Sequence, residues 1–312
     1  MSDALIVVPD DFPAVFEGSA AHERAKVLGA VQLCSERGAD DAGELARRIG
    51  GAKVAVNIRA YAPFTEAVFA ACPNLKLVSI WGVGTDNVDL EAAKRRGVTV
   101  CNTPGANAIA VGEHAIALMM AVARKIPQID RDMRKGEWPR EMLGQLHGKT
   151  LGVLGTGAIG THVAKLARAF GMTVLEWGAR RGSAAERDDI LKAADFVSLH
   201  VRLTPQTRGF IGAREFALMK REAILINTGR GALVDRDALH EALANQRIGG
   251  AGLDVFHDEP LKAGDAILGF ANTVLSPHNA GQTAEVRRDG LLLTIQNVER
   301  FLAGKPQNVV ST

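Results

Sequence analysis

Lys-Thr-Leu-Gly-Val-Leu-Gly-Thr-Gly-Ala-Ile-Gly, residues 149–160, is the stretch that decides the fold of this chain. Its first half is an apolar run with the length of a buried strand, and its second half spaces three glycines as G-x-G-x-x-G. Apolar residues then recur at steps of three and four from Ile159 to Phe170, which predicts a helix. A strand, a glycine turn and a helix in this order predict a dinucleotide site, with the pyrophosphate at the helix N-terminus.

The three glycines have different expected tasks in that turn. Gly155 permits the tight turn, Gly157 lets the backbone approach the pyrophosphate, and Gly160 lets the helix pack closely on the strand. A lone glycine fingerprint is weak, because glycine-rich turns are common. Further strand–helix units downstream strengthen the prediction.

The bulk properties describe an ordinary soluble protein. The 312 residues suffice for two domains, and the net charge of +2 gives no reason to expect nucleic acid or an anionic membrane as a partner. Three unpatterned cysteines suggest neither disulfides nor a metal site. The N-terminus lacks the features of a signal peptide, and the apolar stretch 108–126 is better interpreted as a buried helix than as a membrane span. We therefore expect a cytoplasmic protein without a metal.

Strands and helices alternate along the chain, which predicts α/β architecture with parallel sheets. One set of strand-like runs precedes the glycine fingerprint, and a second set follows it. A single long helix at 107–126 is expected to carry the chain from the first domain to the second. The terminal helix at 283–303 is expected to return to the first domain, so that the first domain is discontinuous.

Three charged residues follow strands of the second domain. Arg230, Glu259 and His278 each lie just beyond a strand, and ligands of open α/β sheets bind outside the carboxyl ends of the strands. Taken singly, each is more often a surface arginine, a solvated loop acid or a turn histidine. Together they suit reduction of a 2-keto acid: Arg230 binds the carboxylate, His278 protonates the carbonyl oxygen, and Glu259 orients the imidazole and favours its acid form.

Residues of the first domain complete the expected substrate site. Backbone N–H groups of Val83 and Gly84 would form a nest for the substrate carboxylate. Arg59 follows the third strand and is a candidate contact with the substrate or a phosphate. The alternative interpretation of Arg59 is an ordinary surface arginine that binds no ligand.

The chain resembles the D-isomer-specific 2-hydroxyacid dehydrogenase family, which includes glyoxylate/hydroxypyruvate reductases and 3-phosphoglycerate dehydrogenases. The resemblance covers nearly the whole chain, in the segments 84–89, 102–105, 155–160, 200–207, 227–235, 252–260 and 276–281. It implies two doubly wound parallel-sheet domains with a cleft between them. One is a flavodoxin-like substrate domain, residues 1–103 plus 283–312, and the other a Rossmann cofactor domain, residues 104–282.

The resemblance also implies roles for individual residues. The catalytic arginine, glutamate and histidine of the family fall on Arg230, Glu259 and His278. The family's formate dehydrogenase branch has glutamine in place of Glu259, so formate is disfavoured as substrate. A homodimer formed through the cofactor domains is implied as well. The implied cofactor residues, with the glycines of the turn, are Gly155, Gly157, Ala158, Ile159, Gly160, Thr228, Gly229, Asp254, His278 and Gly281.

The end of the second Rossmann strand departs from the pattern of NAD-binding proteins. An acid that binds the ribose hydroxyls is usual there, whereas this chain places Gly178 at that position, two residues after Glu176. Without that acid, Arg180 or Arg181 can pair with a 2′-phosphate. We therefore expect NADP(H), with NAD(H) as the alternative if both arginines are merely solvated charges.

The sequence restricts the substrate less than the reaction. An apolar Ile80-Trp81 edge favours a short 2-keto acid such as glyoxylate or hydroxypyruvate over a phosphate ester, and Trp138 and Arg140 are candidates to reach a neighbouring subunit's site. An interpretation as core or surface residues is equally plausible for Arg59, Trp81, Trp138 and Arg140. The alternatives are an NAD-dependent 3-phosphoglycerate dehydrogenase and a dinucleotide-sensing protein of corepressor type. Two further histidines are interpreted as structural, His114 as a packed helix residue and His200 as a satisfied core histidine.

Overall fold

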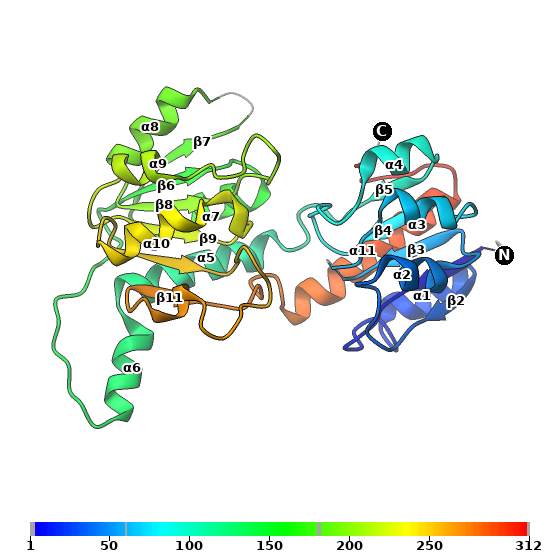
Figure 1. Ribbon diagram of the computed structural model, residues 1–312, viewed down its shortest axis with the longest axis horizontal. Helices are drawn as coiled ribbons and strands as arrows, with labels where there is room; N and C mark the ends of the chain where they lie inside the picture. Colours follow the sequence, from blue (N-terminus) through cyan, green and yellow to red (C-terminus); the bar gives the residue numbers. More distant parts are fainter. Residues whose placement is uncertain (1–3, 60, 180–181, 311–312) are drawn as a thin grey trace. The chain divides into compact units, whose positions relative to one another are not determined.

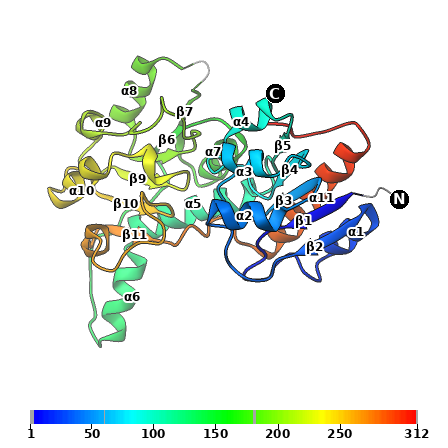
Figure 2. The same cartoon turned by 45° about the vertical axis from the view of Figure 1, so that its right-hand side comes forward.

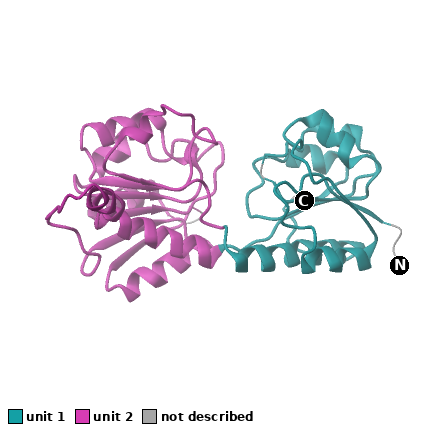
Figure 3. Cartoon of the chain, turned by 90° about the horizontal axis from the view of Figure 1, so that it is seen from below, with its two compact units in different colours: residues 1–107, 282–312 teal, residues 108–281 magenta. Residues whose placement is uncertain are grey.

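A computed structural model of the chain describes residues 4–59, 61–179 and 182–310. The chain forms two compact units, one made of residues 1–107 and 282–312 and the other of residues 108–281 (Figure 3). The first boundary lies four residues after the expected one and the second lies one residue before it. Each unit is described here by itself, with the element labels of Figure 1.

Unit 1 is a parallel sheet with helices on both faces (Figure 1). Its strands run in the order β2-β1-β3-β4-β5, and every neighbouring pair is parallel. The strands are β1 (Leu5–Val8), β2 (Ala30–Leu33), β3 (Val54–Asn57), β4 (Leu77–Ile80) and β5 (Thr99–Cys101). The helices are α1 (Ala20–Leu28), α2 (Ala42–Ile49), α3 (Glu66–Ala71), α4 (Leu90–Arg95) and α11 (Ala284–Leu302).

The alternation of side chains along the strands divides the core of unit 1 between the two faces of the sheet. Val7, in the middle of β1, packs with residues of α2, α3 and α4, whereas its neighbours Ile6 and Val8 pack with residues of α1 and α11. Both faces are apolar because helices cover both, which is the pattern of a parallel sheet. The contribution of α11 makes unit 1 discontinuous in sequence.

Unit 2 has the same layered construction around a larger sheet (Figure 2). Its strands run in the order β11-β10-β9-β8-β6-β7, again parallel throughout. They are β6 (Thr150–Leu154), β7 (Thr173–Trp177), β8 (Phe196–Leu199), β9 (Ile224–Asn227), β10 (Gly250–Leu253) and β11 (Thr273–Leu275). The helical segments are α5 (Ala108–Ala123), α6 (Ile126–Arg134), α7 (Ala158–Ala169), α8 (Ala184–Ala193), α9 (Ala213–Leu218), η1 (Gly231–Leu233), α10 (Arg236–Ala244) and η2 (Ala266–Gly269).

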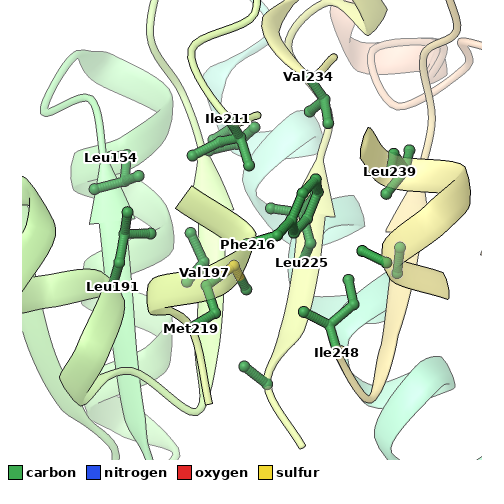
Figure 4. Packing of buried hydrophobic residues seen from close by; sticks show 14 of the residues in the cluster. Leu154, Leu191, Val197, Ile211, Phe216, Met219, Leu225, Val234, Leu239 and Ile248 are labelled. Carbon is green, nitrogen blue, oxygen red and sulfur yellow. The ribbon is translucent and has the colours of Figure 1, made fainter. Parts of the chain in front are cut away.

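Two apolar cores hold these layers together. Figure 4 shows part of the core on one face, where Phe216 of α9 lies among residues of β8, β9 and α10. On the other face, α5 and α7 pack against β6, β8 and β9. After β7 the chain returns to the other side of β6 to form β8, so the sheet has its topological switch point between β6 and β8. Ligands of such sheets bind at that point, beyond the carboxyl ends of the strands.

The structure confirms the α/β architecture with parallel sheets, but the predicted long helix at 107–126 is wrong in extent. Helix α5 ends at Ala123, and α6 starts at Ile126 after Lys125, whose φ of +49° interrupts the helix. Arg124 and Lys125 interrupt the apolar run at this break, and Pro127 follows in the first turn of α6, so the sequence does carry a signal of the boundary. A left-handed residue ends a helix whether or not the apolar pattern continues.

Candidate active site

The glycine turn lies between β6 and α7, at the switch point of the sheet. Gly155 has φ of +112°, and a Cβ placed there would lie 2.4 Å from the carbonyl carbon of His200. A Cβ on Gly160 would lie 1.9 Å from the carbonyl oxygen of Gly155. These two glycines are therefore required by contacts within the protein itself.

Gly157 is different, because a Cβ there would meet no atom of the described chain within 4 Å. It is the N-cap of α7, and no side chain caps that end of the helix. Ala158 and Ile159 follow in the first turn, where backbone N–H groups have no partner within the helix. This open helix N-terminus suits an anionic pyrophosphate.

A buried threonine beyond the carboxyl end of β9 also fits a bound dinucleotide. Thr228 follows β9 and is buried, yet its Oγ1 has no hydrogen-bond partner among the described residues. The next residue, Gly229, is fixed by a bond from its N–H to Oδ1 of Asn227, 3.0 Å. A buried hydroxyl without a partner is costly unless a ligand satisfies it. The turn after β6 and the turn after β9 therefore fit the cofactor that the glycine fingerprint predicts.

The end of β7 carries no free carboxylate in the structure as described. Glu176 forms an ion pair with Arg168 of α7. Gly178 lies against the glycine turn, since a Cβ there would approach Oγ1 of Thr156 to 2.8 Å. Arg180 and Arg181, the predicted partners of a 2′-phosphate, lie outside the described residues.

Glu259 and His278 are in direct contact. Nδ1 of His278 lies 2.6 Å from Oε2 of Glu259, while the other oxygen of Glu259 accepts a bond of 2.9 Å from the N–H of Phe256. Both side chains are partly exposed. The carboxylate is thus held by two donors and holds the imidazole in one orientation, which leaves Nε2 to face a substrate.

Arg230 acts on the same carboxylate through its charge. Burial opposes ionisation of Glu259, but the hydrogen bonds from His278 and Phe256 and the charges of His278 and Arg230 outweigh it and lower its pKa. The loops that carry Arg230 and Glu259 lie backbone against backbone, since a Cβ on Gly231 would lie 2.1 Å from the carbonyl carbon of Phe256. The structure therefore brings the arginine, the glutamate and the histidine together.

Asp254 shapes the loop that carries His278. Its backbone oxygen accepts from the N–H of His278 at 2.8 Å, and its carboxylate accepts from the N–H groups of Asn279 at 3.0 Å and Ala280 at 2.9 Å. His278 has φ of +52°, in the left-handed region that is uncommon outside glycine. Gly281, the remaining cofactor residue implied by the resemblance, ends unit 2 directly after this loop.

Two residues near Asp254 were not predicted as part of the site. Oγ of Ser276 donates to Oδ1 of Asp254 at 2.6 Å, and Nε2 of His114 lies 2.8 Å from the same Oγ. His114 belongs to α5, more than a hundred residues away in sequence. The Glu113-His114 pair in an otherwise apolar helix is the only sequence signal for this link, and it is equally compatible with simple packing of the helix.

The candidate substrate residues of unit 1 have mixed surroundings. In the described structure the N–H groups of Val83 and Gly84 donate no hydrogen bond, which suits an anion nest. Arg59 donates from Nη2 to the carbonyl oxygen of Pro13. Ile80 is only 4% exposed and belongs to the core rather than to a substrate surface, which corrects the expected apolar edge. Its neighbour Trp81 packs against Gly290 of α11.

The remaining residues named from the sequence are exposed side chains or parts of the packed interior. Trp138 is 71% exposed and Arg140 is exposed, both in the irregular segment after α6. His200 bonds to Oγ of Ser198 at 2.8 Å and is the satisfied histidine that was expected. Among the described residues, no three His, Cys, Asp or Glu side chains are grouped to bind a metal. Nor, in those same ranges, is any helix long and apolar enough to cross a membrane.

Comparison with known proteins bears on this arrangement. Residues 116–280, more than half of the chain, match the family described as "D-isomer specific 2-hydroxyacid dehydrogenase, NAD binding domain". The glyoxylate reductase of Korarchaeum cryptofilum is 41% identical over 265 residues, which cover 80% of each chain. The D-3-phosphoglycerate dehydrogenase of Methanocaldococcus jannaschii is 40% identical over 281 residues, covering 86% of this chain and 53% of that protein.

Among solved structures, an acyclic imino acid reductase in complex with NADPH and D-Arg is similar over nearly its whole length. Its TM-score is 0.90 at 29% identity, and the alignment covers 98% of this chain and 99% of that one.

Proposed function

The chain belongs to the D-isomer-specific 2-hydroxyacid dehydrogenase family, and we propose that it reduces a short 2-keto acid such as glyoxylate or hydroxypyruvate with NADPH. Membership makes it an oxidoreductase that acts on CH–OH groups with a nicotinamide dinucleotide. The contact of 2.6 Å between Glu259 and His278, with Arg230 acting on the same carboxylate, is the observation that supports this chemistry most directly.

The proposed roles follow from the charges and the geometry of these side chains. The guanidinium of Arg230 binds the substrate carboxylate and polarises the neighbouring carbonyl. Because Nδ1 of His278 faces Glu259, the proton given to the carbonyl oxygen comes from Nε2. The carboxylate of Glu259 is ionised at neutral pH and stabilises the charged ring before the transfer. In the reverse direction Nε2 accepts the proton of the hydroxyl group.

The residues around the glycine turn would hold the cofactor. The N-terminus of α7 at Gly157 would bind the pyrophosphate, and the buried hydroxyl of Thr228 would bond to the ligand. A reduced nicotinamide supplies the hydride equivalent to the carbonyl carbon.

NADP(H) preference is a proposal that rests on the end of β7. Glu176 is neutralised by Arg168, and Gly178 offers no carboxylate to a ribose. The NADPH complex of the similar imino acid reductase is compatible with it.

Replacing Arg180 by alanine should raise KM for NADPH at least about tenfold with little change for NADH, since one charge-assisted pair to the phosphate is lost. Arg181→Ala should have the smaller effect, and equal effects of Arg180→Ala on both cofactors would rule the assignment out.

The first assay follows loss of reduced nicotinamide absorbance with glyoxylate and hydroxypyruvate, each with NADPH and with NADH. Rapid loss with NADPH supports the proposal. Oxidation of 3-phosphoglycerate with NAD would instead favour the second candidate, which the similarity to D-3-phosphoglycerate dehydrogenases supports. Tight cofactor binding without turnover of any keto acid would favour the dinucleotide sensor.

We propose in addition that the protein is a cytoplasmic homodimer. The surface around α6 supports the dimer, because none of the residues of that helix is buried within the chain. The cysteines Cys34, Cys72 and Cys101 are unpaired, which suits a reducing compartment.

A further inference from the structure

The loop that carries His278 is held by Asp254, and Asp254 is itself held from α5. The carboxylate of Asp254 is fully buried. Its Oδ1 accepts from the hydroxyl of Ser276 and from the N–H of Asn279, and its Oδ2 accepts from the N–H of Ala280. A buried carboxylate with several donors has one preferred orientation, and the backbone bonded to it shares that orientation.

The direction of the bonds shows what His114 supplies. The hydroxyl of Ser276 has a single proton and donates it to Oδ1 of Asp254. The hydroxyl oxygen can then accept from Nε2 of His114, at 2.8 Å. The same Nε2 lies 3.6 Å from Oδ1 of Asp254. His114 is therefore the outer donor of a chain that runs to Ser276, to Asp254 and to the backbone next to His278.

We propose that His114 is a positioning residue for His278: by donating to Ser276 it fixes the carboxylate of Asp254, which holds the 278–280 backbone in its left-handed turn. In the described structure the bond of His114 goes to Ser276 and not to His278. The proposal rests on the proposed function only in naming His278 as the proton donor. The loop geometry itself can be tested without any substrate.

The first experiment measures amide hydrogen exchange of the segment 276–281 in the full-length protein without cofactor. His114→Leu removes the donor at similar volume, and Ser276→Ala removes the intermediate hydroxyl. Each should speed exchange of the N–H groups of Asn279 and Ala280 about tenfold. His114→Gln keeps an N–H donor near the position of Nε2 and should stay within about twofold of the unaltered protein.

His162 provides a matched control on the same helix pair. It lies on α7 against Gly112 of α5, and its Nε2 has no hydrogen-bond partner in the described part of the chain. His162→Leu should leave exchange of 276–281 unchanged. Unchanged exchange in His114→Leu, or equally fast exchange in His114→Leu and His114→Gln, would overturn the proposal, because packing rather than the donated bond would then matter.

The second experiment is kinetic and separates positioning from general stability. His114→Leu should lower kcat about tenfold while KM for the keto acid, whose carboxylate Arg230 is proposed to bind, changes less than about twofold, and His114→Gln should restore kcat. Adding His114→Leu to Ser276→Ala should lower kcat no further, since both act through one chain of bonds. Additive losses would refute the chain. If the unaltered protein reduces no keto acid, the proposed function fails, and the exchange experiment still decides the role of His114.

Discussion

At the scale of single residues, Glu259 has the most constrained environment of the proposed catalytic groups. Each of its carboxylate oxygens has its own donor, Nδ1 of His278 and the N–H of Phe256. These bonds lower its pKa in spite of its partial burial, so it stays negative wherever the enzyme is folded at neutral pH. The imidazole of His278 therefore faces a fixed negative charge.

Replacing Glu259 by glutamine should keep the bond to the imidazole but remove the charge. We expect kcat for keto acid reduction to fall about 10²-fold while KM for NADPH changes less than about twofold, because the histidine ring loses its counter-charge during the proton transfer. Asp258→Asn is the matched control, since this neighbouring carboxylate pairs with Arg236 at 2.5 Å and not with the histidine. A kcat of Glu259→Gln within about twofold of the unaltered protein would contradict the assigned role.

His200 provides a second prediction, on stability. Burial lowers its pKa to about 4, whereas an unfolded histidine titrates near 6.5. The unfolded chain thus takes up this proton first, and the free energy of unfolding should fall as the pH drops from about 6.5 to about 4, by at most about 3 kcal/mol. Urea titrations at several pH values measure this. His200→Gln should flatten the dependence in that window, and the exposed His147→Gln should leave its slope intact.

Single residues also show what the sequence can and cannot predict. The carboxyl ends of parallel strands lie at one edge of a sheet, so the sequence could predict that Arg230, Glu259 and His278 lie close together. The link from His114 to Ser276 was not predictable, since it joins segments 162 residues apart and nothing in the periodicity of α5 marks it. Burial of Ile80 was missed for a related reason: strands covered on both faces are apolar throughout, so the pattern does not separate core from surface.

At the scale of elements, the strand, glycine turn and helix at 149–170 follow the prediction closely, because each residue type there suits its local conformation. The observed β6 and α7 match the expected segments to within one residue. The junction of α5 and α6 rests on one left-handed residue, Lys125, and its sequence signal is Pro127 in the first turn of α6. Elements whose ends are fixed by glycine or by capping side chains are predictable, and others are not.

The turn makes a prediction that separates folding from binding. Gly157→Ala should leave the melting temperature almost unchanged, since the new methyl group meets no protein atom within 4 Å, but should weaken NADPH binding at least about tenfold. Gly155→Ala should lose both stability and binding, because its methyl group would overlap the backbone of His200. Thermal unfolding and fluorescence titration measure the two properties. Normal NADPH affinity in Gly157→Ala would place the pyrophosphate elsewhere.

At the scale of the whole molecule, the two α/β units and the return of the chain to the first unit were predictable from the alternation of strands and helices. The surface that α6 leaves uncovered was not. Apolar side chains of α6 and the segment after it are exposed, to 99% in the case of Met142. They are Ile126, Met133, Trp138 and Met142. An apolar surface of this kind is typical of an interface.

We expect this surface to form the proposed dimer. Placing two charges on α6, Ile126→Glu with Met133→Glu, should convert the dimer to a monomer, because burying unpaired carboxylates is costly. Light scattering coupled to size-exclusion chromatography reports the mass directly. Val27→Glu, at an even more exposed apolar position of unit 1, should leave the mass unchanged. A double variant that keeps the mass of a dimer would mean that the interface lies elsewhere.

The discontinuity of unit 1 also matters while the chain is being made. Leu291, Ile295 and Val298 of α11 fill one face of a sheet whose strands are all synthesised within the first 101 residues. Until α11 leaves the ribosome, α1 alone covers that face, whereas unit 2 is already complete in sequence. The nascent sheet is then a natural substrate for a chaperone. The unit that is translated first would be the last to become native.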